Sequence, residues 1–206
     1  MRAIRQFSFW LMAVLLLVTA ANASDDVKVL PIRDEQQLYE FIAEFNNNGP
    51  ANIQFGYLAD VTGLNSVFSS TTTKDETTAL FTVVITADAF QVVNHGASRI
   101  TDRKGTCTIY LNNGPSDFSN PASFSQGTPI QVSTYRQTVL VNTVTNEFLS
   151  TNTHTITAVE TFTLNGVSYR LGQLGKSYRS TYNGYSLVIQ PPIVTGSFAA
   201  LAIGMK

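Results

Sequence analysis

The sequence predicts a mainly β protein, built as a single antiparallel β-barrel or, as the weaker alternative, a β-sandwich, with one amphipathic helix near the N-terminus. Three observations support this class. From residue 51 onward, apolar and polar residues alternate with the period of a strand. Turns containing Gly, Asn and Pro divide this region into about nine or ten strands with hairpin-length links. Threonine, a strand-former that can face water, is abundant, whereas charged residues make up only 13% of the chain.

Residues 1–23 have the pattern of a cleavable secretory signal peptide. Arg2 and Arg5 supply a basic start, residues 7–18 are apolar except for Ser8, and residues 21–23 form the small-x-small pattern of a cleavage site. The apolar run of 12 residues is shorter than the roughly 17–25 that a membrane-spanning helix needs. We therefore expect a secreted or periplasmic protein with no membrane span after cleavage.

The region that follows is expected to contain an N-terminal segment over 24–50 and an antiparallel β domain over 51–206. Within the first of these, a helix is expected over 34–48, with Asp34 as its N-cap. Its apolar residues recur at helical spacing on one face, at Leu38, Phe41, Ile42 and Phe45. Three asparagines followed by Gly-Pro then end the helix, which we expect to cover the β structure.

The β domain is expected to consist of short strands joined by turns. The expected strands occupy residues 52–60, 77–87, 90–93, 98–101, 106–112, 130–143, 149–164, 167–171, 185–190 and 197–203. The expected turns lie at 94–96, at 102–105, near Asn146 and at Asn165-Gly166, the last being the strongest hairpin signal because both residues tolerate positive φ. Residues 62–76 and 113–128 read as longer polar loops.

The expected strand over 149–164 favours the barrel over the sandwich. Its odd positions from 151 to 163 are threonine at six of seven places, so this face should meet water and the even face should point inward. That inward face carries His154 and Glu160, and Arg136 occupies a similar position in the preceding strand. Ionisable side chains are tolerated better in a barrel lumen than in a solid sandwich core. In general shape such a barrel is similar to calycin-type carriers, an analogy of fold that assigns no function.

Arg136, His154 and Glu160 are the first candidate site. A hairpin turn near residues 146–147 would place Arg136 opposite Ala158 and diagonal to Glu160. These side chains would then form a polar spot in a pocket that orients a ligand or performs acid–base chemistry. The alternative is a structural Arg–Glu pair, with His154 in contact with solvent.

A second candidate site is the aromatic and basic stretch near the C-terminus, which contains Tyr169, Tyr178, Arg179 and Tyr182. Lys176, Arg170 and Tyr185 lie in the same stretch. Such side chains can stack on a sugar ring or hold an anionic ligand. The alternative is that the tyrosines are ordinary residues of a half-buried strand face.

Other reactive residues are expected to have structural roles. Cys107 alternates with Ile109 and Leu111 and should be a buried, inert thiol, and His95 should be a solvated turn residue. The loop over 112–117 lacks the ligand spacing of a calcium site, and no His or Cys spacing fits zinc. We expect no metal and no cofactor. Phe118 and Phe124 should anchor their loop against the barrel wall.

Charge and motif content narrow the classes of function. The chain has 13 Lys+Arg and 14 Asp+Glu, and removing Arg2 and Arg5 leaves 11 against 14, a net charge of −3 that disfavours nucleic acid as a partner. Nucleophile-elbow, zinc-protease, P-loop and Rossmann motifs are absent from the sequence, so no catalytic residue is assigned. The leading hypothesis is an exported, non-enzymatic barrel that binds a small, partly apolar molecule in its lumen. The alternatives are an envelope or extracellular interaction protein with a Thr/Tyr-rich surface, and an enzyme with its site at the barrel mouth. The sequence leaves the oligomeric state open.

Overall fold

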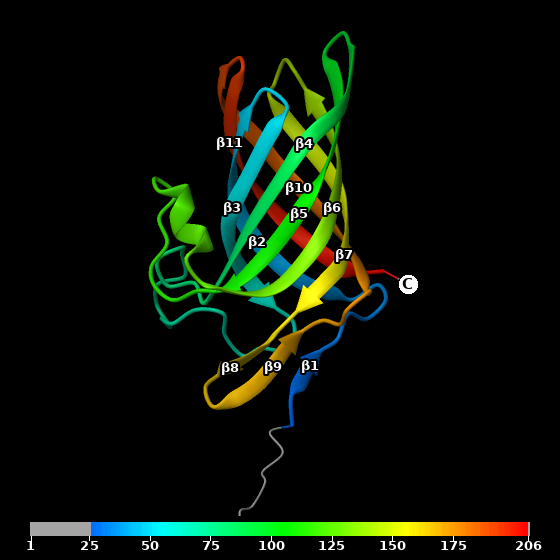
Figure 1. Cartoon of the computed structure of the whole chain (residues 1–206). Coiled ribbons are helices and arrows are strands. Elements are labelled where there is room, and N and C mark those ends of the chain that lie inside the picture. The colour runs from blue at the N-terminus through cyan, green and yellow to red at the C-terminus, as the bar shows by residue number, and fades with distance from the viewer. Residues whose placement is uncertain (1–25, 206) are drawn as a thin grey trace, which may run out of the picture.

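The chain forms a closed eight-stranded β-barrel in the computed structural model, which describes residues 26–205 (Figure 1). Closure excludes the sandwich alternative. The expected signal peptide lies outside the described residues. The barrel strands are β2 (Gln37–Asn48), β3 (Ala51–Val61), β4 (Phe81–His95), β5 (Ser98–Leu111), β6 (Thr128–Asn142), β7 (Glu147–Val159), β10 (Ser177–Gln190) and β11 (Ile193–Gly204). Each is antiparallel to its neighbours, and β11 pairs with β2 to close the barrel.

The two ends of the barrel differ. At one end, four tight hairpins join β2–β3, β4–β5, β6–β7 and β10–β11, and we call this end the mouth (top of Figure 1). Below the other end, the closed end, lies a small sheet of β1 (Lys28–Leu30), β8 (Thr161–Leu164) and β9 (Val167–Leu171). Phe162 of this sheet packs edge-on against Phe81 of the barrel, with ring centroids 5.5 Å apart. The barrel interior is therefore sealed at one end only.

A loop covers the outer face of β3. It contains the short 3-10 helix η1 (Pro121–Ser125), whose Phe124 is fully buried against Phe55, with ring centroids 5.5 Å apart. Phe118 packs on the same surface, 4.9 Å from the Phe124 ring. The expectation that these two phenylalanines anchor the loop to the barrel wall is confirmed.

The helix expected over 34–48 is wrong, because residues 37–48 form β2, a strand of the barrel. Alternate residues of this strand point inward, among them Phe41, Ala43 and Phe45, whereas Ile42 faces outward and is 42% exposed. Leu38 is buried as well, because it is the extra residue of a bulge opposite Ala202 and Ile203 of β11, which interrupts the alternation near the start of the strand. Pairing with β3 and β11 on both sides then outweighs the local helix propensity.

The turn expected at 102–105 is also wrong, because these residues lie in the middle of β5. The two short strands expected at 90–93 and 98–101 are the mouth ends of β4 and β5, which are 15 and 14 residues long. Gly105 is present for close strand approach rather than for a turn, since a Cβ there would lie 1.9 Å from the Thr86 carbonyl oxygen. Arg103 therefore lies on a barrel strand.

The remaining strands agree with expectation apart from their ends. The strand expected over 149–164 is divided into β7 and β8, and β10 and β11 start earlier than expected. The hairpin at Asn165-Gly166 is confirmed, with φ of 51° and 77° at its two residues. The threonines at 151, 153 and 157 are exposed, as the alternation predicted.

Candidate functional site

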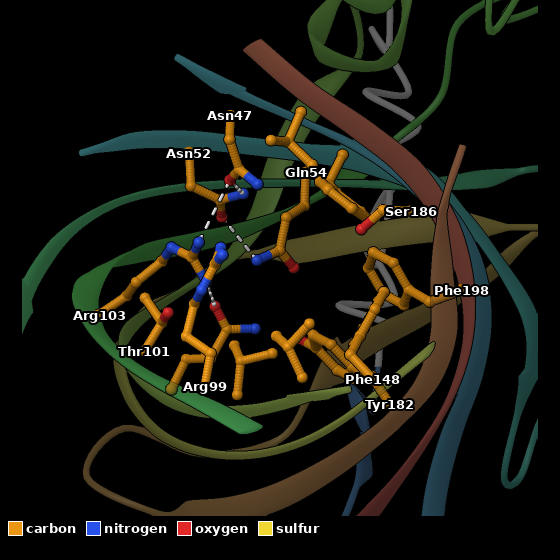
Figure 2. A pocket seen from close by; sticks show the side chains of 15 residues that line it. Asn47, Asn52, Gln54, Arg99, Thr101, Arg103, Phe148, Tyr182, Ser186 and Phe198 are labelled. Atoms are coloured by element: carbon orange, nitrogen blue, oxygen red, sulfur yellow. Dashed lines mark hydrogen bonds between the residues drawn. The ribbon is translucent and has the colours of Figure 1, made fainter. Parts of the chain in front are cut away.

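A pocket opens inside the mouth of the barrel, and we call it the mouth pocket (Figure 2). It has a volume of about 80 Å³ and opens to solvent. Its lining residues are Phe45, Asn47, Asn52, Gln54, Arg99, Thr101, Arg103, Gln137, Val139, Val141, Phe148, Tyr182, Ser186, Val194 and Phe198. These residues come from seven barrel strands, so the pocket belongs to the barrel as a whole.

One side of the mouth pocket is aromatic. The ring of Tyr182 stacks on Phe198 with centroids 4.5 Å apart, and Phe148 meets Phe45 edge-on at 5.6 Å. All four side chains are buried and lock one another in place. Figure 2 shows Phe148, Tyr182 and Phe198 together on one side of the space. This wall is suited to the apolar part of a ligand.

The facing side is polar, and hydrogen bonds hold its amide side chains in order. Gln54 Nε2 donates to Asn52 Oδ1 at 2.7 Å, and Asn52 Nδ2 donates to Asn47 Oδ1, also at 2.7 Å. Arg103 donates from Nη2 to Asn47 Oδ1 at 3.4 Å and from Nη1 to Gln137 Oε1 at 3.2 Å. The guanidinium of Arg103 is thus held between two neutral amides (Figure 2).

The charge of the mouth pocket is unbalanced. Of the 15 lining residues, Arg99 and Arg103 are cationic and none is acidic. Burial lowers the pKa of Arg103 from its ordinary value, although a guanidinium stays charged at any physiological pH. Arg103 Nε and the Tyr182 hydroxyl are both buried without a hydrogen-bond partner. The pocket therefore has an excess of positive charge and unused polar atoms beside an aromatic wall.

Comparison with protein-family models, with curated proteins and with solved structures found no significant match to this chain. Function must therefore be argued from the pocket. Its lining has no Asp, Glu, His, Cys or Lys side chain, so it holds no group that titrates near neutral pH. The polar groups that the lining offers are guanidinium, amide and hydroxyl groups, which can form hydrogen bonds with a ligand.

His154 lies below the mouth pocket and does not line it. It is inward-facing and buried, as the strand alternation predicted. Its Nε2 lies 2.8 Å from Ser180 Oγ and its ring stacks on Tyr178, with centroids 4.3 Å apart. Burial lowers its pKa to about 3. The imidazole is therefore neutral at physiological pH and part of the packed interior.

The expected inward positions of Arg136 and Glu160 are wrong. Arg136 pairs with Thr153 rather than Ala158 and points to the exterior, where its guanidinium lies 5.6 Å from the centroid of the Phe90 ring. Glu160 follows the end of β7 and is exposed. The expected register between β6 and β7 was wrong. In the structure, odd residues of β6 pair with even residues of β7, and these pairs face the inside of the barrel. A register error of this parity moves a whole strand to the opposite face.

The aromatic and basic stretch is divided between inside and outside. Tyr182 lines the mouth pocket, and Tyr178 is buried below it, where its hydroxyl donates to Gln131 Oε1 at 3.2 Å. Tyr169 belongs to β9 and stacks on Phe162, whereas Arg179 faces solvent. Tyr185 is exposed, so among these tyrosines Tyr178 and Tyr182 are buried while Tyr185 faces solvent. The ligand-binding role of these residues stays a prediction.

Sequence reasoning found only Tyr182 of the pocket lining, and the two charged residues that it missed are Arg99 and Arg103. Both lie on β5, and the turn predicted at 102–105 concealed the second. A signal was present, because the inward alternation of Leu111, Ile109 and Cys107 continues backward through positions 105, 103, 101 and 99. Extending that alternation across Gly105 would have placed both arginines inside the barrel.

The other candidate residues have the environments expected of them. Cys107 is free and buried, and burial raises the pKa of its thiol to about 12. His95 is exposed at the β4–β5 hairpin, and Asp117 accepts hydrogen bonds from Ser119 within its own loop. Within residues 26–205 no group of three or more His, Cys, Asp or Glu side chains is arranged to hold a metal ion. The described part of the chain contains no helix of the length and apolar character needed to cross a membrane.

Proposed function

We propose that this protein is a non-enzymatic binding protein that holds a small, partly apolar molecule in its mouth pocket. The observation that carries the proposal is the pairing of a buried aromatic wall with a polar wall around one opening into the barrel. The lower interior is filled by side chains, so the ligand enters from the mouth. The expected signal peptide places this activity outside the cytoplasm, in the periplasm or the extracellular space.

The volume of the pocket sets the size of the ligand. A cavity of about 80 Å³ is smaller than the sites that enclose a drug-sized molecule, roughly 300–1,000 Å³, so the pocket holds a small molecule or one end of it. A long lipid chain would need more room below, where the rings of Tyr135, Tyr178 and Tyr182 fill the interior. The pocket therefore favours a compact ligand over a fully enclosed lipid.

Titration with N-phenyl-1-naphthylamine, a neutral apolar fluorophore, tests the proposal. We expect saturable binding to the wild-type protein, detected as a rise in emission. Val139→Trp fills the pocket from β6, and binding should weaken about ten-fold or more. Leu140→Trp is the matched control, because the next residue of the same strand faces outward and is 48% exposed. It should leave the affinity unchanged.

Two outcomes would refute the proposal: no saturable binding by the wild type, or equal loss of binding in both tryptophan variants. Thermal melts of both variants establish that each is folded, and Val141→Trp replaces Val139→Trp if the latter does not fold, since Val141 also lines the pocket. Native mass spectrometry of protein purified from its own host then measures the mass of any ligand that copurifies.

A further inference from the structure

The two arginines of the mouth pocket identify a property of its ligand that the pocket's shape does not. Arg99 and Arg103 lie on one face of β5, and in Figure 2 both side chains extend into the polar side of the pocket. Their positive charges enter a space that is lined otherwise by neutral side chains. These two positive charges call for a negatively charged partner.

Within residues 26–205, no acidic side chain forms a hydrogen bond with either arginine. Arg103 donates only to the amide oxygens of Asn47 and Gln137, and Arg99 Nε donates to the amide oxygen of Asn94 at 3.1 Å. The acidic side chain nearest in sequence, Asp102, belongs to the outer face of β5, where it accepts a hydrogen bond from Thr138 at 2.7 Å. A partly buried charge such as that of Arg103 is costly without a counterion, so a position that served stability alone would favour an apolar or paired residue.

The surroundings of Arg103 also hold its guanidinium in one place. Gln137 Nε2 donates to Ser150 Oγ at 3.0 Å, which leaves Gln137 Oε1 to accept from Arg103. On the other side, the Asn52 amide donates to Asn47 Oδ1, the same oxygen that accepts from Arg103. Asn47 and Gln137 are thus positioning residues, and they prepare a planar donor that suits the oxygens of a carboxylate or phosphate.

We propose that the ligand of the mouth pocket is a small amphipathic oxyanion. Its anionic group lies against Arg103, its apolar part lies against Phe148, Phe198 and Tyr182, and Arg99 attracts it at the opening. This inference rests on the proposed function and adds to it the charge of the ligand. Binding supplies the counterion that the protein lacks, in a pocket where a charge-assisted hydrogen bond is strong.

A matched pair of probes tests the charge separately from the apolar contact. Octanoate and 1-octanol have the same chain length and differ in the anionic group. Each is titrated against the full chain by calorimetry and by displacement of N-phenyl-1-naphthylamine. We expect octanoate to bind about ten-fold more tightly than 1-octanol, the factor expected of one charged hydrogen-bonded contact. Salt should weaken the binding of octanoate and leave that of 1-octanol unchanged.

Arg103→Gln should remove the preference for octanoate and keep the affinity for 1-octanol within about two-fold of wild type. Arg136→Gln is the matched control, because it removes the same charge from the exposed outer face of the neighbouring strand. It should leave both affinities unchanged. If Arg103→Gln does not fold, Arg99→Gln and the salt dependence decide, and the expected result is a several-fold loss for octanoate alone.

The possible failures are distinguishable. Equal affinity of the wild type for octanoate and 1-octanol, or an octanoate preference that survives in Arg103→Gln, overturns the anionic ligand and leaves the proposed function standing. An octanoate preference lost equally in Arg136→Gln also overturns it, because the effect would then be one of net charge. Absence of binding by both probes and by the fluorophore refutes the proposed function itself.

Discussion

The closed half and the mouth half of the barrel are both polar inside, yet they use polar groups differently. In the closed half, Gln131 bonds to Tyr39, Tyr178 and the Leu171 carbonyl, and His154 lies between two serine hydroxyls. In the mouth half, Arg103 Nε and the Tyr182 hydroxyl have no partner. The polar groups of the closed half are therefore bonded to one another, whereas in the mouth half the charge of Arg103 meets only neutral amides.

Truncation of one aromatic residue in each half should give the largest contrast. Tyr178→Ala removes a fully buried ring that stacks on His154, and we expect a loss of about 3–5 kcal/mol in the free energy of unfolding. Phe148→Ala should cost less than about 2 kcal/mol, because Phe148 lines the open pocket and water can enter the space that its ring leaves. Urea unfolding followed by circular dichroism measures both, and equal losses would contradict the division into two halves.

The pH dependence of stability should report on the closed half. His154 has a pKa of about 3 in the folded protein against an ordinary value of 6.5, because burial disfavours the imidazolium. The unfolded chain therefore binds a proton below pH 6.5 that the folded chain does not bind until about pH 3. Stability is retained above pH 6.5 and is lost as the pH falls toward 3, by up to about 1.4 kcal/mol per pH unit from this residue.

His154→Asn isolates that contribution, because asparagine keeps a polar side chain and cannot titrate. We expect the free energy of unfolding of this variant to fall less steeply than that of the wild type between pH 6.5 and 3. Chemical denaturation at a series of pH values makes the measurement, with His95→Asn at the exposed hairpin as the control. A slope that is the same in the wild type and in His154→Asn would show that His154 is protonated in the folded protein.

Removal of a charge from the mouth pocket should stabilise the protein, whereas truncation of an aromatic residue should destabilise it. Arg103→Met keeps the length of the side chain and removes a partly buried guanidinium that has no acidic partner. In the absence of ligand we expect the free energy of unfolding to rise by about 1 kcal/mol, while Arg136→Met changes little. A large loss of stability in Arg103→Met would assign this arginine to the fold rather than to a ligand.

The fold was more predictable from the sequence than the site. Alternation identified the barrel class, the outward threonines of β7 and the inward face of His154, because a strand's two faces see different solvents. The strand β2 was missed because its apolar spacing also fits a helix, and only pairing with β3 and β11 decides between them. Long-range pairing is absent from any local pattern.

The candidate site failed for related reasons. Arg136 was placed inside because the assumed centre of the β6–β7 hairpin, near residues 146–147, differs from the true one by an amount that exchanges the two faces of β6. Arg103 was hidden because the run Asp102-Arg103-Lys104-Gly105 has the composition of a turn, although it lies mid-strand. Tyr182 lines the mouth pocket, and the sequence singled it out only through the aromatic and basic composition of its stretch, since no strand was expected over residues 172–184. Local alternation gave the correct facing within β7 but not for β6 or for the mid-strand part of β5.

The chemical reactivity of thiols gives the smallest and most local comparison of the two halves. Cys107 is buried in the closed half, and burial raises its pKa to about 12, so the native protein should not react with a thiol reagent such as dithionitrobenzoate at pH 8. Ser186→Cys places a second thiol in the lining of the mouth pocket, where it should react, and a bound ligand should protect it. Unfolding in guanidinium chloride should make both thiols reactive. If Cys107 in the native protein were labelled as fast as the thiol of Ser186→Cys, the closed half would open as readily as the mouth. The two halves would then differ in the shape of their interior and not in their local stability.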